Sequence, residues 1–168
     1  MIGVDDRSAA GAERVTVHRR IEAPDDVPLA ELAATVERAM RSLPLPEGAH
    51  LALVLAGDGF LRALNRRYRG IDAPTDVLSF PAGDASRGLA GAGSAAGPFA
   101  GDDAHLGDVI ISVAYAARSA ARQGRPRDAE LALLAVHGLL HLIGHDDADE
   151  AGAEAMRALE RQLGVRDD

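Results

Sequence analysis

The stretch of residues 129–147 constrains the fold of this chain more than any other part of the sequence. It begins with a predominantly apolar run and reaches Gly144, a residue that commonly ends helices. We therefore expect a helix over residues 129–143. His137 and His141 are four residues apart, so this helix places both imidazoles on one face, with Cβ atoms about 5–6 Å apart. The fold must contain this helix and the turn that follows it.

Two imidazoles at this spacing can bind one metal ion, with bonds of about 2.0–2.1 Å. Candidates for a third ligand follow the turn at Gly144, namely His145, Asp146 and Asp147. Ligands at relative positions 0, 4 and 10, with glycine at 7, resemble His-Glu-x-x-His-x-x-Gly-x-x-His of certain zinc proteases. That alignment favours Asp147, whereas His145 directly follows the glycine and is the alternative third ligand. An ordinary pair of core or edge histidines is the competing interpretation.

Gly138 argues against a peptidase, because the zinc proteases carry their general base, a glutamate, at this position. Glycine has no side chain for that role. We interpret this substitution as opening the pocket beside the metal for a bulkier group. The chain contains no cysteine, so any metal site must use His, Asp or Glu.

A second informative stretch carries the densest group of basic residues. Four arginines lie within eight residues and no acid lies among them: Arg62, Arg66, Arg67 and Arg69. Arginine binds phosphate through two parallel hydrogen bonds and stays charged. A solvated helix face is the alternative for the first three. Arg69 lies at the expected helix exit, where a loop can direct its side chain into a cleft. Ser79 could face either the cleft or solvent.

The remaining pattern mixes strands and helices without strict alternation, which favours a single α/β or α+β domain with a small sheet packed against helices. The expected strands cover residues 14–21, 50–56, 76–81 and 106–113, and the expected helices cover residues 29–43, 60–68, 114–123 and 129–143, with a last helix from about residue 149. We expect residues 1–13 to be a flexible tail, residues 14–168 to form one domain, and residues 82–104 to be an irregular loop.

Composition limits the class of protein. No run approaches the roughly 20 apolar residues of a membrane-spanning helix, and residues 1–13 have no apolar core for a signal peptide. We therefore expect no membrane association, and a cytoplasmic location as the default. The net charge of −8 counts against unaided binding of nucleic acid, so the local arginine group matters more than the total.

The two stretches together resemble the YbeY family of bacterial endoribonucleases. The family signature His-Gly-x-Leu-His-Leu-x-Gly-Tyr-Asp-His aligns with His137 to Asp147, and Leu-Asn-x-x-Tyr-Arg-x-x-Asp-x-Pro-Thr-Asp-Val-Leu-Ser-Phe-Pro aligns with Leu64 to Pro81. Leu106-Gly107-Asp108 is also similar, and so is the acidic last helix, with Glu150, Glu154, Met156 and Glu160. Two positions depart from the family pattern: His145 replaces a common tyrosine, and Asp147 replaces the usual third histidine.

The resemblance implies a single-strand-specific, metal-dependent endoribonuclease that matures the 3′ end of small-subunit rRNA and acts in ribosome quality control. It implies an α+β fold, an α/β/α sandwich with a mixed sheet of about four strands and the metal helix across it. The metal ligands would be His137, His141 and Asp147. Zinc is the expected metal, with manganese, nickel or iron as alternatives because Asp147 is a harder ligand. Arg69, with His137 and His141, would be catalytic, and Arg66 and Ser79 are further candidates for contact with substrate.

Partners implied by the resemblance are single-stranded RNA and the small ribosomal subunit or an assembly protein. Either a metal-activated water or the neighbouring 2′-hydroxyl could attack phosphorus, and the sequence leaves both routes open. Two other functions are considered: a non-catalytic ribosome-assembly factor with a structural zinc, and, with Gly138 against it, a metalloprotease.

Overall fold

The fold is built on one mixed β-sheet. The computed structural model describes residues 10–11, 14–20, 22–82 and 104–167. Its strands are β1 (Ala10–Gly11), β2 (Val15–Arg19), β3 (His50–Ala56), β4 (Val77–Pro81) and β5 (His105–Ser112). They lie in the order β1-β2-β3-β5-β4. The three central strands are parallel to one another, whereas β1 and β4 run antiparallel at the two edges.

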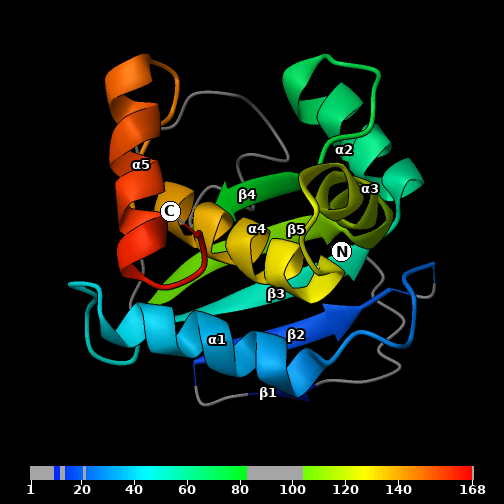
Figure 1. Cartoon of the computed structure of the whole chain (residues 1–168). Helices are drawn as coiled ribbons and strands as arrows, with labels where there is room; N and C mark the ends of the chain where they lie inside the picture. The colour runs from blue at the N-terminus through cyan, green and yellow to red at the C-terminus, as the bar shows by residue number, and fades with distance from the viewer. Residues whose placement is uncertain (1–9, 12–13, 21, 83–103, 168) are drawn as a thin grey trace.

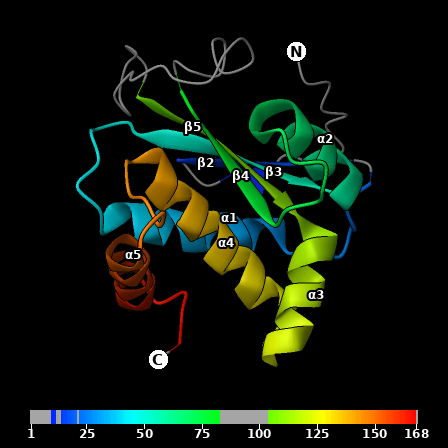
Figure 2. The same ribbon diagram turned by 90° about the horizontal axis from the view of Figure 1, so that it is seen from above.

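Helices cover both faces of this sheet (Figure 2). The helices α1 (Leu29–Arg41) and α4 (Arg127–Leu142) pack on one face, and α2 (Asp58–Arg69) packs on the other. Successive residues of a strand point to opposite faces. Accordingly, Leu53 and Leu55 of β3 are buried with α1 and α4, while Val54 is buried with α2. The result is an α/β/α sandwich, as the family resemblance implies.

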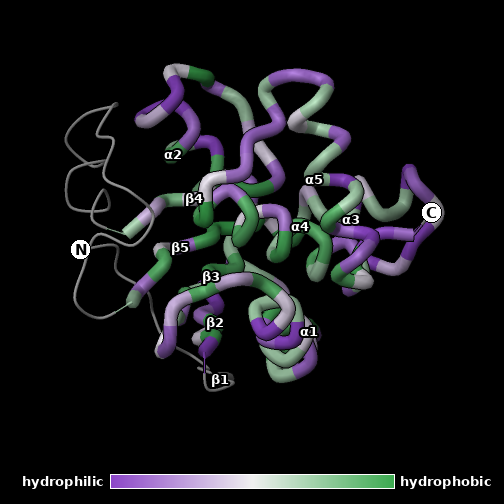
Figure 3. Tube along the Cα trace, turned by 90° about the vertical axis from the view of Figure 1, so that its left-hand side faces the viewer, coloured by the Kyte–Doolittle hydropathy of each residue, from purple (hydrophilic) through white to green (hydrophobic). Residues whose placement is uncertain are grey.

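The other two helices connect and flank these layers. The helix α3 (Val113–Gln123) follows β5 directly, and the Ser112 hydroxyl caps it by accepting a hydrogen bond from the Tyr115 amide. The helix α5 (Glu150–Gln162) packs against the α1 and α4 layer through buried Met156. Figure 3 shows the hydrophobic residues along β3 and β5, inside the sandwich. The core is therefore aliphatic, as expected for a chain with 3% aromatic residues.

The predicted strands and helices are confirmed, with ends that differ by at most two residues. The mixed sheet of about four strands is also confirmed, with the two-residue β1 as an addition at its edge. Of the expected tail 1–13, residues 10–11 form β1, and the other residues lie outside the described part of the chain. Most of the expected loop 82–104, residues 83–103, lies outside them as well.

Candidate metal centre

Helix α4 carries the two histidines across the sheet (Figure 1). Gly138, between them in sequence, is buried against the sheet. A Cβ atom at Gly138 would overlap the Cγ1 atom of Val109 and lie 3.0 Å from the Ser79 hydroxyl oxygen. The interpretation that Gly138 opens space beside the metal is therefore wrong. The missing side chain instead lets α4 lie close to β4 and β5, and this fixes the height of the histidines above the sheet.

His137, His141 and Asp147 bring three possible ligands together. The two histidine Nε2 atoms are 3.1 Å apart. Each Asp147 carboxylate oxygen lies 3.5 Å from one of them, Oδ2 from His137 and Oδ1 from His141. Tetrahedral zinc with bonds of about 2.0–2.1 Å holds neighbouring donor atoms about 3.3 Å apart. The spacing of the two Nε2 atoms is close to this value, and one donor atom from each of the three side chains lies within 4.8 Å of the others. A small movement of the Asp147 carboxylate would let all three side chains bind one metal ion.

The hydrogen bonds on the far sides of the imidazoles determine which nitrogens face each other. His137 Nδ1 lies 2.7 Å from a Glu160 carboxylate oxygen, and His141 Nδ1 lies 3.0 Å from the carbonyl oxygen of His145. Both partners accept hydrogen bonds, so each Nδ1 carries its ring's proton. When both rings are neutral, the two Nε2 lone pairs and the Asp147 carboxylate converge without a donor between them. Such a group of acceptors favours binding of a cation, either a proton or a metal ion.

The pKa values of the two imidazoles move in opposite directions. Burial disfavours charge on both rings. At His137 the hydrogen bond with Glu160 and the negative charge of that residue outweigh burial, and they raise the pKa above its ordinary value. At His141 burial and the nearby positive charge of His137 lower the pKa. Without a metal, a proton shared by the pair therefore belongs to His137, while His141 stays neutral and able to bind a metal.

The turn after α4 delivers the third ligand. Gly144 has a φ of +102°, a conformation that side chains disfavour, and it reverses the chain so that Asp147 returns to the two histidines. Asp149 then caps α5 by accepting a hydrogen bond from the Gly152 amide. A Cβ atom at Gly152 would collide with the Asp146 carbonyl oxygen. The turn is thus held closely against the first turn of α5.

His145 does not join this group. Its carbonyl oxygen accepts the hydrogen bond from His141, and the metal-binding group found among the described residues consists of His137, His141 and Asp147. The geometry therefore favours Asp147 over His145 as the third ligand, as the ligand spacing predicts.

A cavity of about 420 Å³ opens over the three side chains. Its other lining residues come from the α2–β4 segment and from the turn: Arg69, Thr75, Asp76, Val77, Ser79 and Asp146. Arg69 is exposed, and no ion pair joins it to the described part of the chain. The Ser79 hydroxyl faces α4 and donates a hydrogen bond of 3.1 Å to the Gly138 carbonyl oxygen. Arg69, a cation without an ion pair among the described residues, thus lies in the same cavity as the candidate metal ligands.

Comparison with known proteins identifies the family of this chain. The model of the family described as endoribonuclease YbeY matches residues 18–166. The chain belongs to this family. An endoribonuclease YbeY of Moorella thermoacetica is 42% identical over 137 residues, which cover 79% of this chain and 85% of that protein. One of Rhodopseudomonas palustris is 46% identical over 129 residues, covering 71% and 68%. Membership confirms the family and the enzyme class that the two motifs predict.

A solved structure supports the fold alone. The solution structure of a Thermotoga maritima protein has a TM-score of 0.56 and 19% sequence identity, and the match covers 89% of this chain and 85% of the other. No helix in the described part of the chain has the length and apolar character needed to cross a membrane.

The other arginines of the basic group lie apart from the cavity of this YbeY family member. Arg62 forms an ion pair with Asp72 through two contacts of 2.8 and 3.0 Å. Arg66 lies beside that pair in a separate surface hollow, and Arg67 lies over the Tyr68 ring, 5.6 Å from its centre. Arg69 is therefore the member of this group that the structure brings to the metal ligands.

Two residues near the site, Asn65 and Glu160, escaped the sequence analysis as functional residues. Asn65, buried in α2, donates a hydrogen bond of 2.9 Å to the Ala73 carbonyl oxygen and so ties the loop before β4 to the helix. Glu160 contacts His137 from another helix. These residues were visible in the sequence, but the contact of Glu160 joins residues that are 23 positions apart, and no local pattern indicates it.

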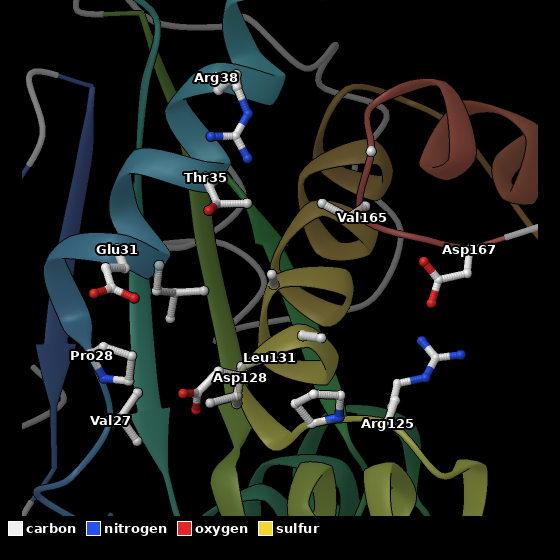
Figure 4. Close-up of a pocket in the computed structure, with 15 residues that line it drawn as sticks. Val27, Pro28, Glu31, Thr35, Arg38, Arg125, Asp128, Leu131, Val165 and Asp167 are labelled. Atoms are coloured by element: carbon white, nitrogen blue, oxygen red, sulfur yellow. The ribbon is translucent and has the colours of Figure 1, made fainter.

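A second cavity, of about 310 Å³, lies away from the metal ligands, between α1, the start of α4 and the C-terminal residues (Figure 4). Arg38, Arg125, Glu31, Asp128 and Asp167 place mixed charges around its apolar wall. Arg125 is already paired with buried Glu130 at 3.3 Å. Because both positive and negative side chains line this cavity, its charge does not indicate one class of ligand.

Proposed function

We propose that this chain is a metal-dependent endoribonuclease that cleaves single-stranded RNA. Its roles would be 3′-end maturation of small-subunit rRNA and ribosome quality control. The observation that carries this proposal is the shared cavity of Arg69 and the group His137, His141 and Asp147. Family membership supports RNA as the substrate. A metal and a phosphate-binding cation in one cavity are a combination that promotes phosphodiester hydrolysis.

The metal is proposed to be zinc, held by two imidazole nitrogens and one carboxylate. Manganese, nickel and iron are the alternatives, since a carboxylate in place of a third imidazole favours harder metals. When bound, the metal supplies a Lewis acid and brings the pKa of a coordinated water toward about 7. Three protein ligands leave one tetrahedral position open, which is typical of catalytic and not of structural zinc sites.

The side chains of the cavity have separate roles in this proposal. Arg69 binds the scissile phosphate and offsets the negative charge that grows on its oxygens during attack. Ser79, whose proton is committed to the Gly138 carbonyl, can only accept a hydrogen bond from a substrate hydroxyl. Arg66 lies outside the cavity and would contact a phosphate further along the strand. Among the cavity carboxylates, Asp76 and Asp146 are candidates to accept a proton.

Two attack routes remain compatible with these roles. In the first, water attacks phosphorus and gives a proton to a base, while the 3′-oxygen departs with a proton. The products then carry a 5′-phosphate and a 3′-hydroxyl. In the second, the neighbouring 2′-hydroxyl attacks, its proton leaves to a base, and the 5′-oxygen departs with a proton to give a 2′,3′-cyclic phosphate. The end groups of the products distinguish the two routes.

A non-catalytic assembly factor with a structural zinc is the second candidate. Such sites are usually closed by four protein ligands, whereas the group found in the described part of the chain has three. A metalloprotease is disfavoured because position 138 is glycine, where the zinc proteases have their catalytic glutamate.

We further propose that the chain acts in the cytoplasm as a single domain over residues 14–168. Because the net charge is −8, a ribosomal or assembly protein is proposed to help deliver the substrate.

The test is cleavage of a fluorescent single-stranded RNA by the full chain, compared with the same RNA annealed to its complement. Cleavage of the single strand that stops with a chelator and returns with zinc or manganese is expected. The duplex should be cut much more slowly. Metal bound at one equivalent per chain without any cleavage would favour the structural role, and digestion of casein would favour the protease.

A further inference from the structure

Glu160 is the most deeply buried charged side chain near the metal centre. It lies on α5, and its carboxylate is 1% exposed. One oxygen is 2.7 Å from His137 Nδ1, and the other accepts a hydrogen bond of 2.6 Å from Arg166 Nε. Burial of a carboxylate is costly unless both its charge and its oxygens are satisfied. Here one partner is a candidate metal ligand, and the other is an arginine near the C-terminus.

The contact with Glu160 has a direct consequence for His137. An Nδ1–H hydrogen bond to a carboxylate fixes the tautomer of an imidazole and the rotation of its ring, so that Nε2 faces the metal. His141 has only a backbone carbonyl oxygen in the same role. The two rings are thus held differently, one by the neighbouring turn and one by a different helix.

The chain beyond α5 is folded to place Arg166 against Glu160. Gly164 adopts a φ of +76°, and the amide of Val165 donates a hydrogen bond of 3.1 Å to the Glu160 carbonyl oxygen. Val165 and Asp167 line the second cavity (Figure 4). Arg166, between them in sequence, instead pairs with Glu160. The turn therefore places Val165 and Asp167 at the second cavity and Arg166 against Glu160.

We propose that Glu160 and Arg166 form a positioning pair for the metal centre, in which Arg166 holds the Glu160 carboxylate and Glu160 holds the His137 ring. This proposal rests on the metal-dependent function proposed above. It makes residues after the last helix a determinant of metal affinity. Neither residue touches the substrate cavity, whose lining contains neither of them. Their effect on catalysis would therefore pass through His137.

The first experiment measures zinc affinity of the full chain by competition with a chromophoric chelator. The variants are Glu160→Gln, Arg166→Ala and Arg166→Lys. Loss of such an outer partner lowers metal affinity about 10- to 100-fold. We expect a loss in this range for Glu160→Gln and for Arg166→Ala, and partial recovery for Arg166→Lys. Arg161→Ala is the matched control, because Arg161 belongs to the same helix but pairs with Glu154 on its outer side, and we expect no change.

The second experiment does not require a metal. Nitrogen-15 NMR of the metal-free protein reports which ring nitrogen of His137 carries the proton. We expect an Nδ1–H that is protected from exchange in the wild type and exposed to exchange in Arg166→Ala. Thermal unfolding of the same metal-free samples identifies loss of folding. A destabilised variant that keeps the protected Nδ1–H would show a purely structural role and overturn the proposal.

The outcomes separate this proposal from the metal site itself. If the wild type binds zinc and both Glu160→Gln and Arg166→Ala bind it equally well, the positioning pair is overturned and the metal site stands. If the control Arg161→Ala loses affinity to the same extent, the effect is not specific to the pair and the proposal is overturned. If the wild type binds no metal, the proposed function is overturned together with its positioning pair.

Discussion

The Nε2 atoms of His137 and His141 lie 3.1 Å apart, and each ring has its Nδ1 atom against a hydrogen-bond acceptor. Two neutral imidazoles in these tautomers present lone pairs to each other. Such a contact is unfavourable unless a proton on His137 or a metal ion lies between the two nitrogen atoms. The carboxylate of Asp147 completes the arrangement, with each of its oxygens 3.5 Å from one nitrogen. The two Nε2 atoms and the Asp147 carboxylate are therefore already arranged to bind a cation.

Gly138→Ala should destabilise the protein although alanine favours helices by about 1 kcal/mol relative to glycine. Its Cβ atom would overlap Val109, and overpacking of this kind costs about 1–3 kcal/mol. Urea unfolding measures the change. Gly59→Ala in α2 is the control, because a Cβ atom there meets nothing within 4 Å, and it should be neutral or stabilising. A more stable Gly138→Ala would show that α4 can move away from the sheet freely.

Asp147→Ala should weaken metal binding, because it removes one of three ligands, whereas His145→Ala should leave binding nearly unchanged. His145 contributes its backbone carbonyl oxygen to His141, and alanine retains that atom. Isothermal titration with zinc measures both affinities. The opposite order of effects would make the His145 imidazole the third ligand and would require a different turn after Gly144.

Arg69→Ala should reduce cleavage of single-stranded RNA by about 100-fold or more, as expected when a group that stabilises transition-state charge is removed. Metal content should stay at the wild-type level, since Arg69 is not a ligand. Arg67→Ala is the matched control, because it removes an exposed arginine of the same helix that does not line the cavity. Equal activities of the wild type and Arg69→Ala would remove the proposed role of Arg69 in phosphate binding.

The metal-free protein should show a pH-dependent contribution from the contact of His137 with Glu160. Burial raises the pKa of Glu160, but its hydrogen bonds with His137 and Arg166 outweigh this and lower it below the ordinary value of 4.5. Despite burial, the contact with Glu160 raises the pKa of His137 above 6.5. The electrostatic contribution to stability is therefore complete between pH 4.5 and 6.5. It is lost as pH falls through the lowered value or rises through the raised one.

The measurement is the difference in unfolding free energy between wild type and Glu160→Gln across this pH range, with chelator present. The difference should be largest between pH 4.5 and 6.5 and should shrink on both sides. A difference that does not vary with pH would mean that the contact is not an ion pair in the folded protein.

Local patterns predicted the elements and the ligand set, whereas contacts between distant segments could not be predicted from them. The spacing of His137 and His141 and the glycine that follows required only helix geometry. Gly138 was misinterpreted because its packing partner, Val109, belongs to a strand that no local pattern connects with α4. Glu160 was visible only as an acid of the last helix. Its role depends on how α5 packs against α4, which is a tertiary contact.

Metal content of the purified full chain and of His141→Ala tests the central claim most directly. Elemental analysis after dialysis against zinc should find about one equivalent per chain in the wild type and almost none in His141→Ala. Circular dichroism should show that both proteins are folded. Equal metal content in the two folded proteins would contradict the assignment of this centre and the metal-dependent mechanism built on it.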